Sequence, residues 1–105
     1  MVTKLTILER LLLLGILPES GNFVTMKILQ RLRLALGFTE EDIAKYNLVV
    51  TESNVAWENE EGPVNIPLGK VAREEIVKAL EKLDKDGKVG ARHLSLYEKF
   101  GFNEE

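Results

Sequence analysis

Apolar residues recur at helical spacing from the start of the chain. A helix is predicted to begin at Thr6, because Thr6 and Glu9 have the spacing of a capping box, in which each side chain satisfies a backbone N–H near the other. Its apolar stripe consists of Leu8, Leu11, Leu12 and Ile16. Leu13 and Leu14 widen the apolar arc, so we expect this helix to be buried on more than one side before it ends near Pro18.

A second helix is predicted between two turn signals. Asn22 or Thr25 caps its start, and Gly37 follows its end, where we expect the left-handed conformation that glycine adopts readily. Its inner stripe consists of Ile28, Leu29, Leu32, Ala35 and Leu36. A short third helix should follow over about residues 40–46, because Thr39 and Asp42 repeat the capping-box spacing.

The pattern then becomes typical of strands. Residues 48–51 and 55–57 are rich in β-branched and aromatic side chains, and the polar residues 52–54 between them suit a tight turn. We therefore predict a β-hairpin over residues 47–58. Residues 64–66 are expected to form a third short strand that stops at Pro67.

Helical spacing returns in the last third of the chain. A long helix is predicted from about Leu68 or Lys70 to Leu83, and the turn at residues 84–87 ends it. A last helix over residues 91–100 should carry Leu94, Tyr97 and Phe100 on its inner side. The predicted fold class is α+β and mainly helical, with about five helices and one small antiparallel β-hairpin. The predicted core centres on Leu8, Leu11, Leu12, Ile28, Leu32, Ile76, Leu80, Leu83, Leu94 and Phe100.

Composition places the chain among small globular domains. Its 105 residues suit one domain spanning 1–105, and 45% hydrophobic with 30% charged residues is too apolar for disorder. The sequence has no cysteine, which excludes disulfides and thiolate metal sites and favours a reducing compartment. The apolar run over residues 11–17 is too short to span a bilayer and lacks the flanks of a signal peptide. We therefore expect a soluble, cytoplasmic protein.

Catalytic and metal-binding patterns are weak throughout the sequence. The run Asp84-Lys85-Asp86-Gly87 resembles part of a calcium loop, but the register that fits Gly87 puts Lys82 and His93 where acids are required. His93 is the only histidine and has no carboxylate or serine three or four residues away, so a solvent-facing position on a helix is expected. We expect no enzyme activity, no cofactor and no metal, although distant carboxylates can converge in a fold.

Two surfaces are candidates for binding a partner. Trp57 with Glu58, Glu60 and Glu61 forms an aromatic and acidic stretch, which either binds a protein partner or covers the core and protects an exposed hairpin edge. The second helix has a basic flank, which either contacts nucleic-acid phosphates or is simply a solvated face. The residues of this flank are Lys27, Arg31 and Arg33. The net charge of −3 does not favour general binding to nucleic acid.

The first helix also suggests self-association. Four consecutive leucines at residues 11–14 span most of the circumference of a helix. Either the later helices of the same chain cover them, or part of the helix forms a symmetric homodimer through Leu11, Leu13 and Leu14.

Two resemblances emerge from these patterns. The order helix, helix, short helix, hairpin over residues 5–58 resembles a winged-helix domain, which implies nucleic-acid binding. The departure is the acidic start of the helix in the recognition position, Thr39-Glu40-Glu41-Asp42. Residues 5–14 (LTILERLLLL), 21–25 (GNFVT) and 94–100 (LSLYEKF) are similar to small uncharacterised phage and prophage proteins, which implies a cytoplasmic accessory factor.

The functional expectation is a non-catalytic, protein-binding accessory or regulatory module. It fits a phage-encoded factor that acts on a host protein. The alternative is a winged-helix-like nucleic-acid-binding protein that uses the basic flank of the second helix.

Overall fold

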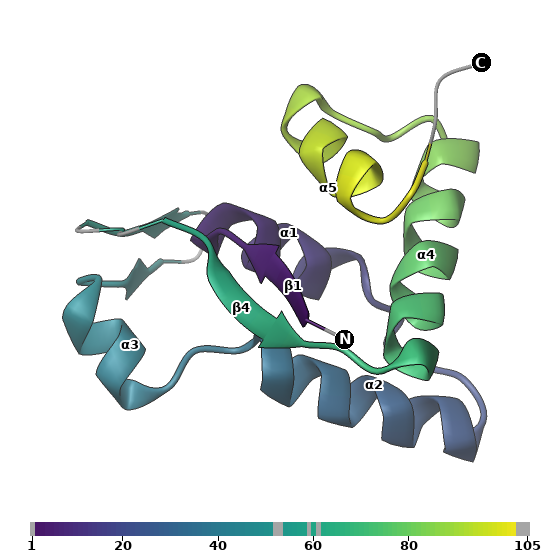
Figure 1. Ribbon diagram of the computed structural model, residues 1–105, viewed down its shortest axis with the longest axis horizontal. Helices are drawn as coiled ribbons and strands as arrows, with labels where there is room; N and C mark the ends of the chain where they lie inside the picture. Colours follow the sequence, from purple (N-terminus) through teal and green to yellow (C-terminus); the bar gives the residue numbers. More distant parts are fainter. Residues whose placement is uncertain (1, 52–53, 59, 61, 103–105) are drawn as a thin grey trace.

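The computed structural model describes residues 2–51, 54–58, 60 and 62–102 (Figure 1). Its elements in chain order are β1 (Val2–Leu5), α1 (Ile7–Ile16), α2 (Phe23–Leu36), α3 (Glu40–Lys45), β2 (Val49–Val50), β3 (Val55–Ala56), β4 (Val64–Pro67), α4 (Lys70–Lys85), a 3₁₀ turn (Ala91–His93) and α5 (Leu94–Lys99). The predicted α+β, mainly helical class is confirmed. The described strands form two small antiparallel sheets, one of which is the predicted hairpin, so the second sheet was missed.

The second sheet comes from strands far apart in the sequence. β1 pairs antiparallel with β4, with Val2 opposite Pro67 and Leu5 opposite Val64. The strand expected at residues 64–66 is therefore confirmed as β4, but β1 was not predicted, because four residues with a threonine on the inner side give a weak alternation. The predicted hairpin is confirmed in a shorter form as β2 and β3, and its turn at residues 52–53 lies outside the described residues.

The hydrophobic core lies between α1, α2, α4 and the β1–β4 sheet, and α5 covers it on the side of α4 that faces α1 (Figure 1). Its fully buried side chains are Leu5, Leu13, Leu29, Leu32, Leu36, Leu68, Ile76, Leu80 and Leu96. Burying such a set at roughly 1.5–3 kcal/mol per side chain supplies the main driving force for folding. Of the predicted core, Leu32, Ile76, Leu80 and Phe100 are buried, and Leu8, Leu11, Leu12, Ile28 and Leu83 are only half-buried.

The last helix is rotated relative to the prediction. Leu94 is 56% exposed, whereas Leu96 is fully buried and Phe100 is nearly so. His93, expected in solvent, is buried, because the inward face of this segment follows residues 93, 96, 97 and 100 at helical spacing. The His93 Nδ1 accepts a hydrogen bond of 2.8 Å from the Gly90 backbone N–H, so the imidazole closes the turn that leads into α5.

The helix ends agree with the predicted caps except at Gly37. The Thr6–Glu9 and Thr39–Asp42 capping boxes are both present, and Asn22 caps α2 by accepting from the Thr25 N–H. Gly37 has a φ of −69° and a ψ of 175°, which is extended and not left-handed. The prediction was wrong because the Arg10 side chain of α1 donates hydrogen bonds to the Leu36 and Gly37 carbonyls at the end of α2.

The α3 helix and the β2–β3 hairpin lie at the opposite end of the molecule from α4 (Figure 1). None of the α3 residues is buried, and the residue after it, Tyr46, is buried at its base. The Tyr46 carbonyl accepts a 2.6 Å hydrogen bond from the Glu58 N–H, which fixes the hairpin to the end of α3.

Candidate protein-binding face

Four side chains on α2 form what we call the outer face of α2. They are Phe23, Lys27, Gln30 and Leu34, which follow one another by four, three and four residues and therefore share one side of the helix. Phe23 is 76% exposed and Leu34 is 78% exposed. At about 1.5 Å per residue, these two apolar side chains lie roughly 16 Å apart along the helix.

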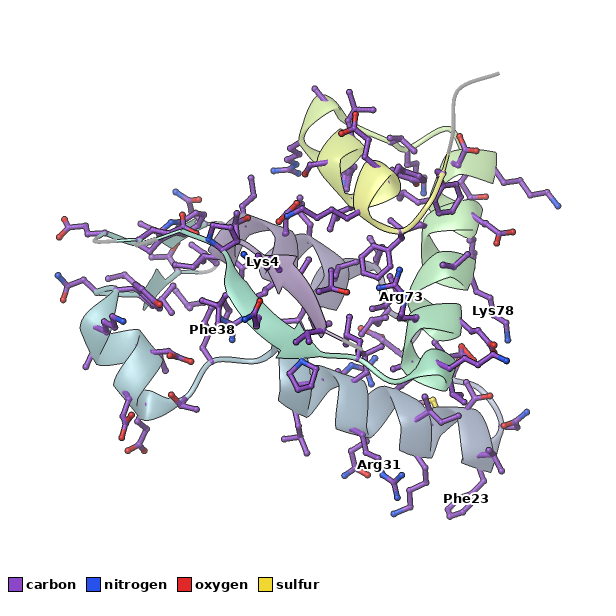
Figure 2. The ribbon with its side chains drawn as sticks, in the orientation of Figure 1. Lys4, Phe23, Arg31, Phe38, Arg73 and Lys78 are labelled. Carbon is purple, nitrogen blue, oxygen red and sulfur yellow. The ribbon has the colours of Figure 1, made fainter. Side chains whose placement is uncertain are left out.

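The outer face is fixed in place by the opposite side of α2. Leu29, Leu32 and Leu36 are buried there against the core, so the helical period turns residues 23, 27, 30 and 34 outward. Figure 2 shows the labelled Phe23 and Arg31 side chains projecting from α2 on the side turned away from β4. A helix with one solvated side ordinarily carries polar residues there, so exposed apolar side chains at both ends are the unusual feature of α2.

The charge of α2 is of one sign. Its sequence contains Lys27, Arg31 and Arg33 and no Asp or Glu. Within the described part of the chain, Arg31 makes no hydrogen bond or ion pair, and the Lys27 ammonium lies 5.9 Å from the centroid of the Phe23 ring. Arg33 is half-buried and donates a 2.6 Å hydrogen bond to the Pro18 carbonyl, so part of its function is to hold the loop between α1 and α2. Lys27 and Arg31 are thus the two cations of α2 available to a partner.

One shallow groove is lined by the outer face itself, and a second lies beside it. A groove of about 550 Å³ runs along α2 and is lined by Phe23, Met26, Lys27, Gln30, Arg33 and Leu34. A second groove, of about 340 Å³, lies between α2 and the start of α4, where Arg31 and Lys70 both line it. The described residues that line the two grooves include four basic side chains and no acidic one.

The stretch predicted to bind a partner through Trp57 is largely used inside the chain. Glu60 accepts a 2.9 Å hydrogen bond from the Ile7 N–H at the start of α1 and lies 3.4 Å from the Trp57 Nε1. Glu58 accepts from the Asn47 amide at 3.2 Å. Trp57 is half-buried, and Glu61 lies outside the described residues. The described glutamates therefore join the hairpin to α1 and α3.

The leucines predicted to drive self-association are mostly covered by the chain itself. Leu13 is fully buried, and Leu12 and Leu14 are half-buried and pack against the core. Leu11 is half-buried at the edge of this cover. None of these α1 leucines is exposed, whereas Phe23 and Leu34 on α2 are 76% and 78% exposed.

Sequence reasoning missed two buried charges on α1. Arg10 is 4% exposed, donates to the Leu36 carbonyl at 2.9 Å and to the Gly37 carbonyl, and lies 4.0 Å from the centroid of the Phe38 ring. It also faces Asp42 at 3.9 Å. This guanidinium replaces the left-handed cap expected at Gly37, because it satisfies the carbonyls that a helix end leaves unpaired. The sequence signal that could have predicted the burial of Arg10 is its three-residue spacing from Ile7 and Leu13, which puts all three on one side of the helix.

The second missed charge, Glu9, fastens α5 to α1. Its carboxylate accepts from the Thr6 N–H at 2.9 Å, from the Ser95 hydroxyl at 2.7 Å and from the Lys99 ammonium at 2.5 Å. Burial raises the pKa of Glu9, but the hydrogen bonds from Lys99, Thr6 and Ser95 lower it by more than burial raises it. The net shift of the pKa is therefore downward. The same Lys99 ammonium donates to the Lys4 carbonyl at 2.8 Å, which adds β1 to this junction.

The described residues were also searched for a metal site and for a membrane-spanning helix. No group of three or more His, Cys, Asp or Glu side chains among them is placed to hold a metal ion. None of the helices in this part of the chain is both long and apolar enough to cross a membrane. Comparison of the chain with protein-family models, curated proteins and solved structures found no match.

Proposed function

We propose that this chain is a non-catalytic protein-binding module that contacts its partner through the outer face of α2 and acts as an accessory or regulatory factor. The observation that carries the proposal is the exposure of Phe23 and Leu34, 76% and 78%, on one side of a helix whose other side is fixed in the core. Exposed aromatic and aliphatic side chains on a rigid element are typical of the central residues of protein interfaces. The resemblance to small phage proteins fits a phage-encoded factor that acts on a host protein.

The hairpin is the weaker candidate for this interface. Its glutamates at positions 58 and 60 already accept hydrogen bonds within the chain, and Trp57 is half-buried. Binding through them would first break these contacts, whereas Phe23, Gln30 and Leu34 make no side-chain hydrogen bond or ion pair within the described residues, and the contact there is the Lys27 ammonium beside the Phe23 ring.

Photo-crosslinking in the native cell tests this function. With a photoreactive residue in place of Gln30, we expect irradiation to join the chain covalently to a defined cellular protein. Adding Phe23→Ser and Leu34→Ser should reduce the adduct at least tenfold, while Leu94→Ser, at an exposed apolar residue on α5, should leave it unchanged. Phe23 and Leu34 are more exposed than Leu94, so the free energy of unfolding should change by no more than about 0.5 kcal/mol for each substitution on α2 and by less than about 1 kcal/mol for Leu94→Ser.

A crosslinker at Lys82, on an exposed part of α4, provides the positional control. Equal adducts from positions 30 and 82, or an adduct that survives the double substitution on α2, would contradict the proposal.

A second candidate function, winged-helix-like nucleic-acid binding, is supported by Lys27 and Arg31, which are exposed on a helix that has no acidic residue. Against it, Glu40 and Glu41 are exposed at the start of α3, the helix in the recognition position. A mobility assay on mixed DNA at low salt separates the two functions. Binding that weakens steeply with salt and disappears in a Lys27→Glu and Arg31→Glu double variant would favour nucleic acid. Arg33 is left unchanged because it also holds the Pro18 carbonyl.

A further inference from the structure

We infer that the partner presents an acidic amphipathic helix, which lies along α2 with its carboxylates facing Lys27, Arg31 and Lys70. This inference rests on the proposed function and names the chemistry of the segment that binds. The charge around the outer face, the spacing of its apolar side chains and the shape of the surface all favour such a segment.

Charge is the first argument, because it selects the sign of the partner. Arg31 and Lys70 line the same groove from α2 and from the start of α4, and Lys27 lies one helical turn before Arg31. Gly69, at the N-cap of α4, provides no side-chain hydrogen bond to the first turn, so the positive end of the α4 dipole adds to the same side of the groove. A partner with like charges here would be repelled, and a neutral one would leave desolvated cations unpaired.

Spacing is the second argument, because it fixes the shape of the binding segment. Phe23 and Leu34 are the two ends of a straight row about 16 Å long, with polar side chains between them. A partner helix of three to four turns matches this length, with one apolar residue at each end and two acidic residues one turn apart in the middle. Side chains at three- and four-residue spacing pack as ridges into the grooves of a second helix.

The form of the surface also favours a helix over the alternatives. All four residues of the outer face line the first groove, and Arg31, one turn after Lys27 on the same helix, lines the second, so a helix that lies along α2 can contact both grooves. A second copy of this chain brings Lys27 and Arg31 against the same two cations, which opposes a dimer through α2. The phosphates of a nucleic-acid strand could contact the cations, but they would leave the exposed Leu34 side chain without an apolar contact. The net charge of the chain, −3, also disfavours nucleic acid.

Selection from an unbiased library of displayed helical peptides tests the inference. The purified full-length chain is the bait, and the Phe23→Ser, Leu34→Ser double variant is the counter-selection, so that only binders dependent on α2 are kept. We expect these binders to carry more Asp and Glu than Lys and Arg on the face between two apolar residues about three turns apart. The best binder should lose at least tenfold in affinity for a Lys27→Glu, Arg31→Glu variant, and should recover when its own acids are changed to lysine.

A Lys82→Glu, Lys85→Glu variant is the matched control, because it reverses two exposed charges on the far end of α4. Its affinity for the same binder should stay within twofold of the wild type. Circular dichroism of each variant establishes that the helices are intact.

Four results would overturn the inference. They are α2-dependent binders that are basic or neutral, the absence of any α2-dependent binder, a homodimer of the chain abolished by Phe23→Ser with Leu34→Ser, and salt-sensitive DNA binding lost with Lys27→Glu and Arg31→Glu. The inference and the proposed function fail differently. A crosslink from position 30 together with non-acidic binders would refute only the acidic character of the partner helix. The absence of a crosslink would refute the outer face of α2 as the interface.

Discussion

Replacing Arg10 by Met tests how the framework that carries α2 is held together. The guanidinium is buried and donates to the Leu36 and Gly37 carbonyls at the C-terminal end of α2. Hydrogen bonds to a charged group contribute about 1.5–3 kcal/mol each, and a buried carbonyl left without a donor costs a further part of its desolvation. Met restores some apolar packing, so we expect Arg10→Met to lower the free energy of unfolding by about 3–4 kcal/mol.

This loss is large relative to the whole domain, whose stability should be about 5–15 kcal/mol. Urea unfolding followed by circular dichroism measures it directly. Arg31→Met is the matched control, because Arg31 is exposed and makes no hydrogen bond or ion pair within the described residues, and its effect should stay within about 0.5 kcal/mol. A loss below about 1 kcal/mol for Arg10→Met, or equal losses for the two variants, would refute the assignment of Arg10 as the cap of α2.

Two further predictions concern α5. Leu96→Ala should lower the free energy of unfolding by about 2–5 kcal/mol and Leu94→Ala by less than about 1 kcal/mol, because Leu96 is fully buried and Leu94 is 56% exposed. Equal losses in thermal or urea unfolding would show that α5 does not turn Leu96 toward the core. The folded pKa of Glu9 lies below its ordinary value of 4.5, so its contribution is complete above that pH and is lost as the pH falls through the folded pKa. The difference in stability between wild type and Glu9→Gln should therefore shrink below pH 4.5, and a difference that stays constant would show that the contacts with Ser95 and Lys99 do not depend on the charge.

The main helices were predictable because local signals and burial agree in them. The helical spacing of Ile76 and Leu80 on α4 and the caps at Thr6, Asn22 and Thr39 are properties of short segments, and the structure has them where the sequence indicated. The β1–β4 pairing was not predictable in this way, because it joins residues more than 55 positions apart and β1 alone carries only four residues of weak alternation.

The errors arise where a tertiary contact overrides the apolar pattern. α1 was expected to present Leu8, Leu11 and Leu12 to the core, but its buried side includes Arg10, and Leu13 is its fully buried residue. A charged residue within an apolar run is ordinarily interpreted as part of the solvated side, but Arg10 is buried through contacts distant in the sequence, with the carbonyls at the end of α2 and with the Phe38 ring.

Only the charged residues of the candidate binding face could be predicted from the sequence. The basic residues Lys27 and Arg31 could be identified as a flank of the second helix, since charge is read directly. Phe23 and Leu34 were not singled out, because exposure depends on which side of α2 the core occupies. The signal that was available is their shared position opposite Leu29, Leu32 and Leu36 on a helical projection.

Hydroxyl-radical footprinting of the chain, alone and in its native cell extract, tests the central claim most directly, because it measures whether Phe23 and Leu34 become covered. In the purified chain both side chains should be oxidised readily, in keeping with their exposure of 76% and 78%. In the extract we predict at least a fivefold slower oxidation of these two residues, with Leu94 on α5 unchanged as the internal reference. Equal oxidation of Phe23 and Leu34 in both preparations, or protection of Leu94 to the same degree, would contradict a partner bound at the outer face of α2.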